Sequence, residues 1–212
     1  MSDIVFYDTA ALNLARKLGT SNLFEASGVS TSSVDPTIRT VWPGAFVAGP
    51  AYPVECSPGD NLAIHVAMEK VPRGSVLVVS TDGFNTGFWG EVLTLAAEAV
   101  GVVGLVIDGG VRDIAAPTVR RFQVFASGIS MRGTIKASVP SVGKPISLAG
   151  TPVVAGDLVV ADDDGVLVVP AAHVEATLVK GKARADKEAA VVEQLVQGRM
   201  TLDVWGLSQW HA

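Results

Sequence analysis

The stretch SVLVVSTDGFNTGFWGEVLTLAAEAVGVVGLVID, residues 75–108, decides the fold. It begins with a continuous apolar run over 75–80, typical of a strand that is covered on both faces. A loop rich in Gly and Asn follows over 82–87, and the pattern then predicts a helix near 90–100 and a second apolar strand over 103–107. A strand, a helix and a strand in this order normally pair in parallel through a right-handed crossover. The stretch therefore predicts a parallel α/β unit.

The segments on either side extend this unit into one mixed domain. Upstream, the pattern predicts a helix, a polar loop, three short strands broken by Gly and Pro, and a second helix, at 8–28, 29–38, 40–42, 45–49, 52–56 and 60–70. Downstream, it predicts a helix, four strands and a long helix, at 115–121, 123–126, 152–154, 157–161, 165–170 and 171–197. No composition shift or low-complexity linker divides the chain. We interpret residues 1–212 as one α/β domain with parallel units, flanking antiparallel strands, an N-terminal helical segment and a long C-terminal helix.

Composition narrows the class of protein. Apolar residues make up 49% of the 212 residues, so a sizeable core is available. Charged residues make up only 17%; this favours an oligomer that buries apolar surface between subunits, although a tightly packed α/β core gives a similar composition. The net charge is −5 and the basic residues are scattered, which argues against a nucleic-acid partner.

The expected location is the cytoplasm. The one cysteine, Cys56, allows no internal disulfide and no cysteine metal cluster, as in a reducing compartment. The first residues lack a basic segment followed by a long apolar one, so no signal peptide is predicted. The most apolar segment, 92–107, contains Glu98 and is too short to span a membrane, so no membrane partner is expected.

The most informative motif is Asp108-Gly109-Gly110-Val111-Arg112-Asp113, which we expect to follow the strand over 103–107 directly. The carboxyl ends of such strands are where open α/β sheets bind ligands. The two glycines let backbone approach a ligand closely, Arg112 offers a fork of donors for a carboxylate, and Asp113 offers the hard oxygens that Mg²⁺ prefers. The structural alternative is a turn with an exposed Arg–Asp ion pair.

A second motif, Trp89-Gly90-Glu91-Val92-Leu93-Thr94, begins the helix near 90–100. The free N–H groups of a first helical turn bind anions. Glu91 precedes Arg112 by one strand–helix–strand unit, so both should lie at the same edge of the sheet. The alternative is that Glu91 complements the helix dipole, as acidic residues in a first turn often do.

The sequence gives weaker support to the other candidate residues. The histidines, His65, His173 and His211, lack the paired spacing of metal ligands, and His65 is interpreted as a helix-packing residue. Cys56 is expected to be a buried structural thiol. The three aspartates at 162–164 are expected to form a hairpin turn. A Schiff-base mechanism would need a buried lysine, and Lys136 is the one lysine in a strand-like context. Four residues are candidates for shaping the substrate pocket: Phe84, Asn85, Phe88 and Trp89.

Together, WGE at 89–91, IDGGVRD at 107–113, VFA at 124–126, GT at 133–134 and GDLVVADDDGV at 156–166 resemble one enzyme family. This is the family of 4-hydroxy-4-methyl-2-oxoglutarate/4-carboxy-4-hydroxy-2-oxoadipate aldolases and the regulator of ribonuclease activity A. The resemblance covers about 20–200. It implies a compact ββα swivelling-domain-like sandwich, assembled as homotrimers or homohexamers with active sites between subunits.

The resemblance also implies roles for individual residues. Asp113 would hold Mg²⁺ or Mn²⁺, partly through waters, and Arg112 would bind the substrate near its 2-oxo acid end. The segment 90–93, namely Gly90, Glu91, Val92 and Leu93, matches the substrate-binding loop. Glu188 is the approximate match of a catalytic glutamate that the neighbouring subunit supplies. The acidic signature position is Asp in some aldolases and Glu91 here, which lengthens its reach by one methylene.

The function implied is a divalent-metal-dependent class II aldolase that cleaves 4-hydroxy-2-oxo acids, such as 4-hydroxy-4-methyl-2-oxoglutarate, to pyruvate. Oxaloacetate decarboxylation is the expected side activity. One alternative is a non-catalytic inhibitor of ribonuclease E, but regulators of that kind commonly lack the aspartate that stands here as Asp113. The other is a lyase of the same site that acts on a different 2-oxo acid.

Overall fold

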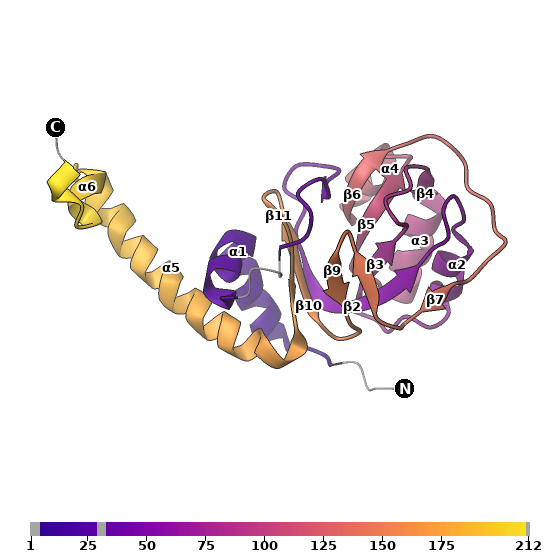
Figure 1. Cartoon of the computed structure of the whole chain (residues 1–212), viewed down its shortest axis with the longest axis horizontal. Coiled ribbons are helices and arrows are strands. Elements are labelled where there is room, and N and C mark those ends of the chain that lie inside the picture. Colours follow the sequence, from indigo (N-terminus) through magenta and orange to yellow (C-terminus); the bar gives the residue numbers. More distant parts are fainter. Residues whose placement is uncertain (1–4, 29–32, 211–212) are drawn as a thin grey trace.

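The computed structural model describes residues 5–28 and 33–210. Its centre is a curved nine-stranded sheet, accompanied by a separate two-stranded hairpin (Figure 1). The strands are β1 (Arg39–Thr40), β2 (Val47–Glu55), β3 (Val76–Ser80), β4 (Gly87–Trp89), β5 (Gly104–Val111), β6 (Gln123–Ile129), β7 (Ser141–Val142), β8 (Ile146–Leu148), β9 (Thr151–Val153), β10 (Leu158–Asp162) and β11 (Gly165–Val169). The helices are α1 (Thr9–Ser27), α2 (Leu62–Met68), α3 (Glu91–Val100), α4 (Ala115–Arg120), α5 (Val174–Val196) and α6 (Thr201–Val204), with single 3-10 turns at Ala171–His173 and Ser208–Trp210. The predicted mixed α/β class is confirmed.

The strand order places the parallel unit in the middle of the sheet. The order is β1-β6-β5-β3-β2-β10-β11, with β4 paired to β5 and β7 paired to β2. Strands β6, β5, β3 and β2 run parallel, and β1, β10, β11 and β7 join antiparallel. Ser33, just before β1, forms a bridge with Leu167 of β11. The two ends of the sheet therefore approach each other, and the sheet is nearly a barrel.

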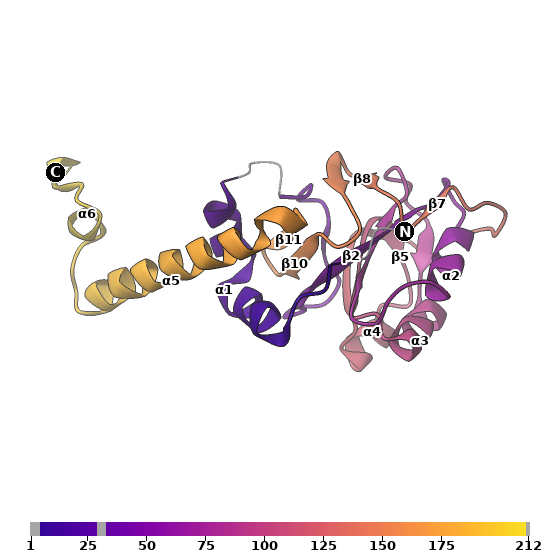
Figure 2. The same cartoon turned by 90° about the horizontal axis from the view of Figure 1, so that it is seen from below.

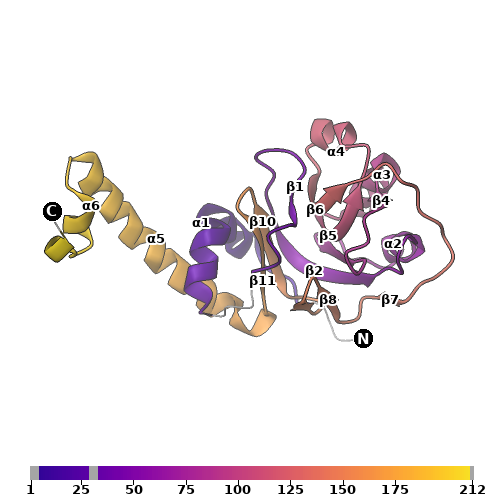
Figure 3. The ribbon, with the colours of Figure 1, turned by 45° about the horizontal axis from the view of Figure 1, so that its top comes forward.

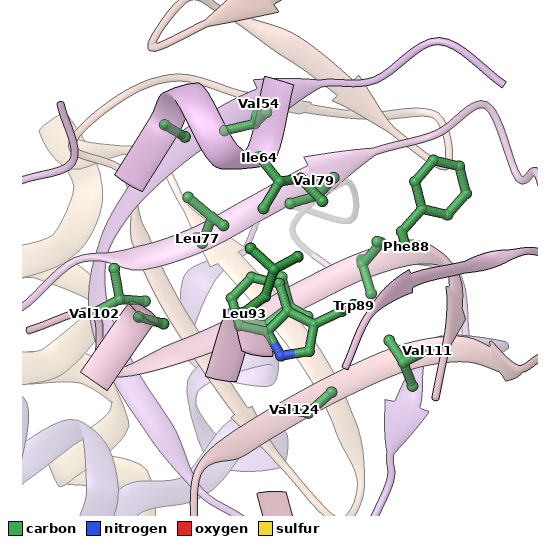
Figure 4. Close-up of a cluster of buried hydrophobic side chains, with 14 of the residues drawn as sticks. Val54, Ile64, Leu77, Val79, Phe88, Trp89, Leu93, Val102, Val111 and Val124 are labelled. Atoms are coloured by element: carbon green, nitrogen blue, oxygen red, sulfur yellow. The ribbon is translucent and has the colours of Figure 1, made fainter. Parts of the chain in front are cut away.

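Three apolar clusters hold the layers together. The first packs α2 and α3 on the parallel strands and includes Leu77 and Trp89 (Figure 4). The second fills the inside of the curved sheet and includes Val78, the next residue of β3. The third packs α1 and α5 on the outer face of the β10–β11 hairpin (Figures 2 and 3). Because neighbouring residues of β3 enter different clusters, this strand is apolar at every position but its last, as the sequence predicted.

One upstream prediction is wrong: the two strands expected over 45–49 and 52–56 are one continuous strand, β2. Its two prolines were expected to break it, because proline has no N–H to donate. Pro50 lies one residue before the pairing with β3 begins at Ala51. Pro53 lies between the stretch paired with β10, which ends at Pro50, and the stretch paired with β7, which begins at Val54. Each proline is tolerated because the pairing of β2 with one of its neighbouring strands begins or ends next to it.

A second prediction is also wrong: β5 does not end at Ile107 but continues to Val111, so most of the Gly-Gly motif is strand. Its last residues pair with β4, which the sequence did not reveal. A Cβ at Gly109 would lie 2.6 Å from Thr81 Oγ1, and one at Gly110 would lie 2.5 Å from Asn85 Oδ1. The two glycines therefore make room for the 81–86 loop of the same chain.

Helix α1 is kinked at Gly19, where φ is 73° and ψ is 170°. Asp162, at the end of β10, caps the second half of the helix by accepting from Thr20 N at 2.9 Å and Thr20 Oγ1 at 2.6 Å. The far half of α5, with α6, projects away from the body (Figure 1). No helix in the two described ranges is both long and apolar enough to cross a membrane.

We expect Asp162→Ala to lower the free energy of unfolding by about 1–2 kcal/mol, because it removes a helix cap that also ties α1 to the β10–β11 hairpin. Urea denaturation measures this change. Asp186→Ala is the control, since Asp186 forms an exposed ion pair with Lys182 at 2.7 Å and should change stability by less than about 0.5 kcal/mol. Equal effects of the two changes would contradict the capping role.

Candidate active site

The candidate site lies at the carboxyl edge of the parallel strands. There β4 leads through Gly90 into α3, and β5 leads into Arg112 and Asp113. The backbone N–H of Arg112 donates to the Trp89 carbonyl at 2.8 Å, which ties the two strand ends together. The expectation that Glu91 and Arg112 lie at the same sheet edge is therefore correct.

Asp113 is held in a conformation that side chains rarely adopt. Its φ is 55°, in the left-handed region. One carboxylate oxygen, Oδ2, accepts from the Glu91 N–H at 3.2 Å and lies 3.8 Å from Arg112 Nε. The Arg112 and Asp113 side chains are 46% and 50% exposed. An ion pair this long and this exposed contributes little to stability, so both groups remain available to a ligand.

Gly90 is required by the closeness of this arrangement. A Cβ at Gly90 would lie 2.4 Å from Asp113 Oδ2 and 3.1 Å from Arg112 Cγ. Gly87 imposes a similar constraint further along the Arg112 side chain, since a Cβ there would lie 3.0 Å from Arg112 Cδ and 2.7 Å from the Ser130 carbonyl. The two glycines let the Arg112 side chain lie flat against the β4 backbone.

A cavity of about 200 Å³ opens beside these residues. Its walls combine the predicted site residues Gly90, Val92, Leu93, Arg112 and Asp113 with five others: Asn61, His65, Gly87, Phe88 and Lys136. Glu91 instead lines a neighbouring hollow that it shares with Asp113 and α4. The part of Glu91 that the structure connects to Asp113 is therefore its backbone N–H.

Asn61 is a site residue that the sequence did not reveal, and His65 and Lys136, which were only minor candidates, also line the cavity. Asn61 is the N-cap of α2, His65 lies within α2, and Lys136 comes from the long connection after β6. That connection is fixed by Asp60, whose carboxylate accepts from Ala137 N at 2.9 Å and Ser138 N at 2.7 Å. No sequence spacing links these segments, because the contact between them is tertiary.

The electrostatics of the cavity follow from this contact. Burial opposes ionisation of Asp60, but hydrogen bonds from Leu62, Ala137 and Ser138 outweigh it and hold the pKa of Asp60 below its ordinary value. Burial, and secondarily the positive charge of Lys136, lowers the pKa of His65 below 6.5. At neutral pH the cavity therefore combines a neutral imidazole with the cations Lys136 and Arg112.

The donor set at Asp113 suits a hard divalent cation that keeps most of its waters. In the described ranges no group of three or more His, Cys, Asp or Glu side chains is placed to hold a metal. Mg²⁺ is usually bound through one or two carboxylates and several waters, so one half-exposed carboxylate beside a cavity fits it. Mn²⁺ prefers the same oxygen ligands.

The remaining candidates lie elsewhere. Glu188 is on α5 and pairs with Arg184 at 2.7 Å; the far half of α5 extends away from the strand ends (Figure 1), so this chain does not bring Glu188 to its own cavity. Trp89 is a core residue stacked on Phe122, and Phe84 and Asn85 are exposed outside the cavity. Of the four pocket-shaping candidates, only Phe88 lines it. His211 lies outside the described residues.

The interpretation of His65 as a helix-packing residue is thus incomplete, because His65 also lines the cavity within electrostatic reach of Lys136. We expect Lys136→Met to raise the pKa of His65 but to leave it below 6.5, because burial is the larger cause of the shift. An NMR titration of the imidazole protons measures this, with Lys180→Met as control. An unchanged His65 titration in Lys136→Met would contradict the electrostatic contact.

The sign of the accompanying effect on stability follows from the shift. The unfolded chain takes up the His65 proton near pH 6.5, before the folded protein does. His65 therefore contributes stability above that pH, and the contribution is lost as the pH falls toward its lowered pKa.

Comparison with known proteins shows the family of the chain. A family model described as RraA-like, Aldolase/RraA, matches residues 20–168. A protein of Halalkalibacterium halodurans named "Putative 4-hydroxy-4-methyl-2-oxoglutarate aldolase" is 36% identical over 160 residues, which cover 74% of this chain and 76% of that protein.

Solved structures show the same fold. The crystal structure of an uncharacterized protein from Pseudomonas syringae pv. tomato matches with a TM-score of 0.86 and 27% identity over 96% of both chains. That of Streptomyces coelicolor RraAS2, described as an unusual member of the RNase ES inhibitor RraA protein family, matches with a TM-score of 0.77 and 25% identity over 88% of this chain and 98% of that one. The chain belongs to the RraA-like (Aldolase/RraA) family.

Proposed function

We propose that this protein is a divalent-metal-dependent aldolase that cleaves 4-hydroxy-2-oxo acids to pyruvate and decarboxylates oxaloacetate as a side activity. The observation that carries the proposal is the pairing of a half-exposed carboxylate, Asp113, with a half-exposed guanidinium, Arg112, beside a small cavity. The name of the Halalkalibacterium halodurans relative supports the reaction class.

The cavity supplies positive groups for a dianionic substrate. The first turn of α3 presents backbone N–H groups of Val92 and Leu93, which have no partner within the helix and attract a carboxylate. Arg112 binds near the 2-oxo acid end through its planar fork of donors. Lys136, which also lines the cavity, complements a second carboxylate of the substrate.

In the proposed reaction the C4 hydroxyl loses its proton, C4 becomes a carbonyl carbon, and the C3–C4 bond breaks. The electron pair of that bond moves toward the 2-oxo oxygen, and C3 is later protonated to give pyruvate. A Mg²⁺ or Mn²⁺ ion bound through Asp113 supplies Lewis-acid stabilisation of the developing charge. Arg112 stabilises the same charge from the protein side.

The proton from the hydroxyl needs an acceptor. A water held by Glu91 in the neighbouring hollow, which Glu91 shares with Asp113, is the proposed base. The neutral imidazole of His65 lines the cavity itself as a second acceptor. Oxaloacetate carries a carboxylate where the 4-hydroxy acids carry the carbinol carbon. Its decarboxylation leaves the same electron pair on the 2-oxo unit, so the same groups serve both reactions.

We further propose a homotrimer or homohexamer in which a neighbouring subunit brings Glu188 to this site. The projecting half of α5 and the segment after it support this assembly, because they carry exposed Val192, Val196, Met200, Trp205 and Trp210. Apolar residues gathered on one arm are typical of a surface that is buried in an assembly.

The proposal is tested by measuring pyruvate release from 4-hydroxy-4-methyl-2-oxoglutarate and from oxaloacetate. We expect EDTA to abolish both activities and Mg²⁺ or Mn²⁺ to restore them. Arg112→Lys keeps the charge but loses the fork, and should lower kcat/KM by about 10²-fold. Circular dichroism is the folding control.

Two outcomes would contradict the proposal. Full activity in EDTA would remove the metal from the mechanism. Failure of the wild type to convert any 2-oxo acid, together with tight binding to ribonuclease E, would assign the chain to the non-catalytic inhibitors instead.

The glycine constraint gives an independent check. We expect Gly90→Ala to reduce both activities by about 10²-fold or more, because the new Cβ would displace the Asp113 carboxylate from its place. Gly133→Ala is the matched control, since a Cβ at Gly133 meets no atom within 4 Å. Similar activities of the two variants would show that the position of Asp113 is not critical.

A further inference from the structure

Asn61 is a buried amide at the wall of the candidate cavity. Its residue is 6% exposed, and it precedes α2 without capping it, because its side chain makes no hydrogen bond to the first turn. Its Nδ2 instead donates to the carbonyl of Phe88, at 2.9 Å. Asn61 therefore links the start of α2 to β4, directly beside Gly87 and Gly90.

The other end of this amide has no partner. Asn61 Oδ1 is buried, and within the described residues no donor reaches it. A buried acceptor without a donor costs about 1–3 kcal/mol, and such groups in folded proteins have a reason. Because Asn61 lines the cavity, a bound ligand is the reason that the structure offers.

The orientation of the amide is determined by its neighbour. If the amide were turned by 180°, Oδ1 would face the Phe88 carbonyl, and two acceptors would stand 2.9 Å apart. The Phe88 carbonyl thus holds the NH₂ group on its own side. Asn61 Oδ1 therefore remains available to accept a hydrogen bond from a ligand. It selects ligands that have a hydrogen-bond donor.

In a 4-hydroxy-2-oxo acid there is one such donor. At neutral pH its carboxylates and its 2-oxo group are acceptors, and the cations Arg112 and Lys136 and the first turn of α3 suit them. The C4 hydroxyl is the single hydrogen-bond donor of the molecule. The buried, unpartnered acceptor that Asn61 supplies to the cavity therefore matches the single donor of the substrate.

We propose that Asn61 Oδ1 accepts a hydrogen bond from the C4 hydroxyl and so selects hydroxylated 2-oxo acids; this inference rests on the proposed aldolase function. An amide is too weak a base to remove the proton, so Asn61 is a specificity-determining and positioning residue. It orients the hydroxyl whose proton a base then takes. Oxaloacetate has no such hydroxyl, so its decarboxylation does not use this contact.

The test compares two reactions in one variant. Asn61→Leu replaces the amide by an apolar side chain of similar size. We expect kcat/KM for cleavage of 4-hydroxy-4-methyl-2-oxoglutarate to fall about tenfold or more, on the scale of one hydrogen bond to a buried group. The lost Asn61–Phe88 bond affects every substrate, so oxaloacetate decarboxylation and the inhibition constant of 2-oxoglutarate, which lacks the hydroxyl, are the references. Both should change less than the cleavage reaction, so the ratio of cleavage to decarboxylation should fall about tenfold.

Thr86→Val is the matched control. Thr86 Oγ1 is also buried, and the described residues offer it no partner, but Thr86 does not line the cavity. Removing this oxygen should leave the ratio of the two activities unchanged. A change in that ratio equal to the one in Asn61→Leu would show that the contact is not specific to Asn61, and would overturn the assignment.

Other outcomes are equally decisive. If Asn61→Leu lowers both activities by the same factor, the residue acts only through its link to Phe88 and the inference fails, while the aldolase function stands. If the wild type converts neither substrate, both proposals fail. If Asn61→Leu does not fold, the wild type is used alone, with inhibition of oxaloacetate decarboxylation as the measurement. We expect 4-hydroxy-2-oxoglutarate to inhibit about tenfold more strongly than 2-oxoglutarate, which lacks the hydroxyl. Equal inhibition by the two compounds overturns the inference.

Discussion

The close approach of the Gly90 backbone to the Asp113 carboxylate is the constraint on which the candidate site depends. A Cβ at Gly90 would lie 2.4 Å from Asp113 Oδ2, and the Glu91 N–H donates to the same oxygen at 3.2 Å. The carboxylate is thus placed by backbone atoms at the start of α3, which a packed core supports. Trp89 is buried in that core, and its indole N–H donates to Thr94 Oγ1 at 2.9 Å. The position of Asp113 therefore follows from the packing of α3 on the sheet.

The far wall of the cavity is built in a different way. It comes from α2 with its N-cap and from the connection after β6, and the buried carboxylate of Asp60 holds the two together by accepting from Ala137 and Ser138. This contact brings Lys136 to the same cavity as Arg112 and within electrostatic reach of His65. One wall thus binds through backbone N–H groups and a guanidinium, and the other offers an ammonium, a neutral imidazole and an amide oxygen. A substrate with acceptors at both ends and a donor between them matches this distribution.

Much of the architecture could be predicted from the sequence, because it depends on local patterns. Apolar runs covered on both faces identified β3 and β5, and a first-turn motif identified α3. The Arg112–Asp113 pair could be predicted because residues that follow parallel strands meet at one sheet edge. The same local reasoning failed at β2, where prolines are tolerated because of gaps in neighbouring ladders, and at Gly109 and Gly110, whose small size serves the 81–86 loop.

The sequence by itself therefore determined the α/β class, the family resemblance and one wall of the site. Each of these depends on residues that are close along the chain or separated by a fixed spacing. The tertiary structure alone decided the other wall. Asn61 and His65 precede Arg112 by a whole strand–helix–strand unit, and Lys136 follows it after β6. The spacing of four residues brings Asn61 and His65 together at one helix, but no periodicity or motif connects them to Lys136 or to Arg112. They share a cavity because the carboxylate of Asp60 pairs with backbone N–H groups of a distant segment, and a contact of this kind exists only after the chain has folded.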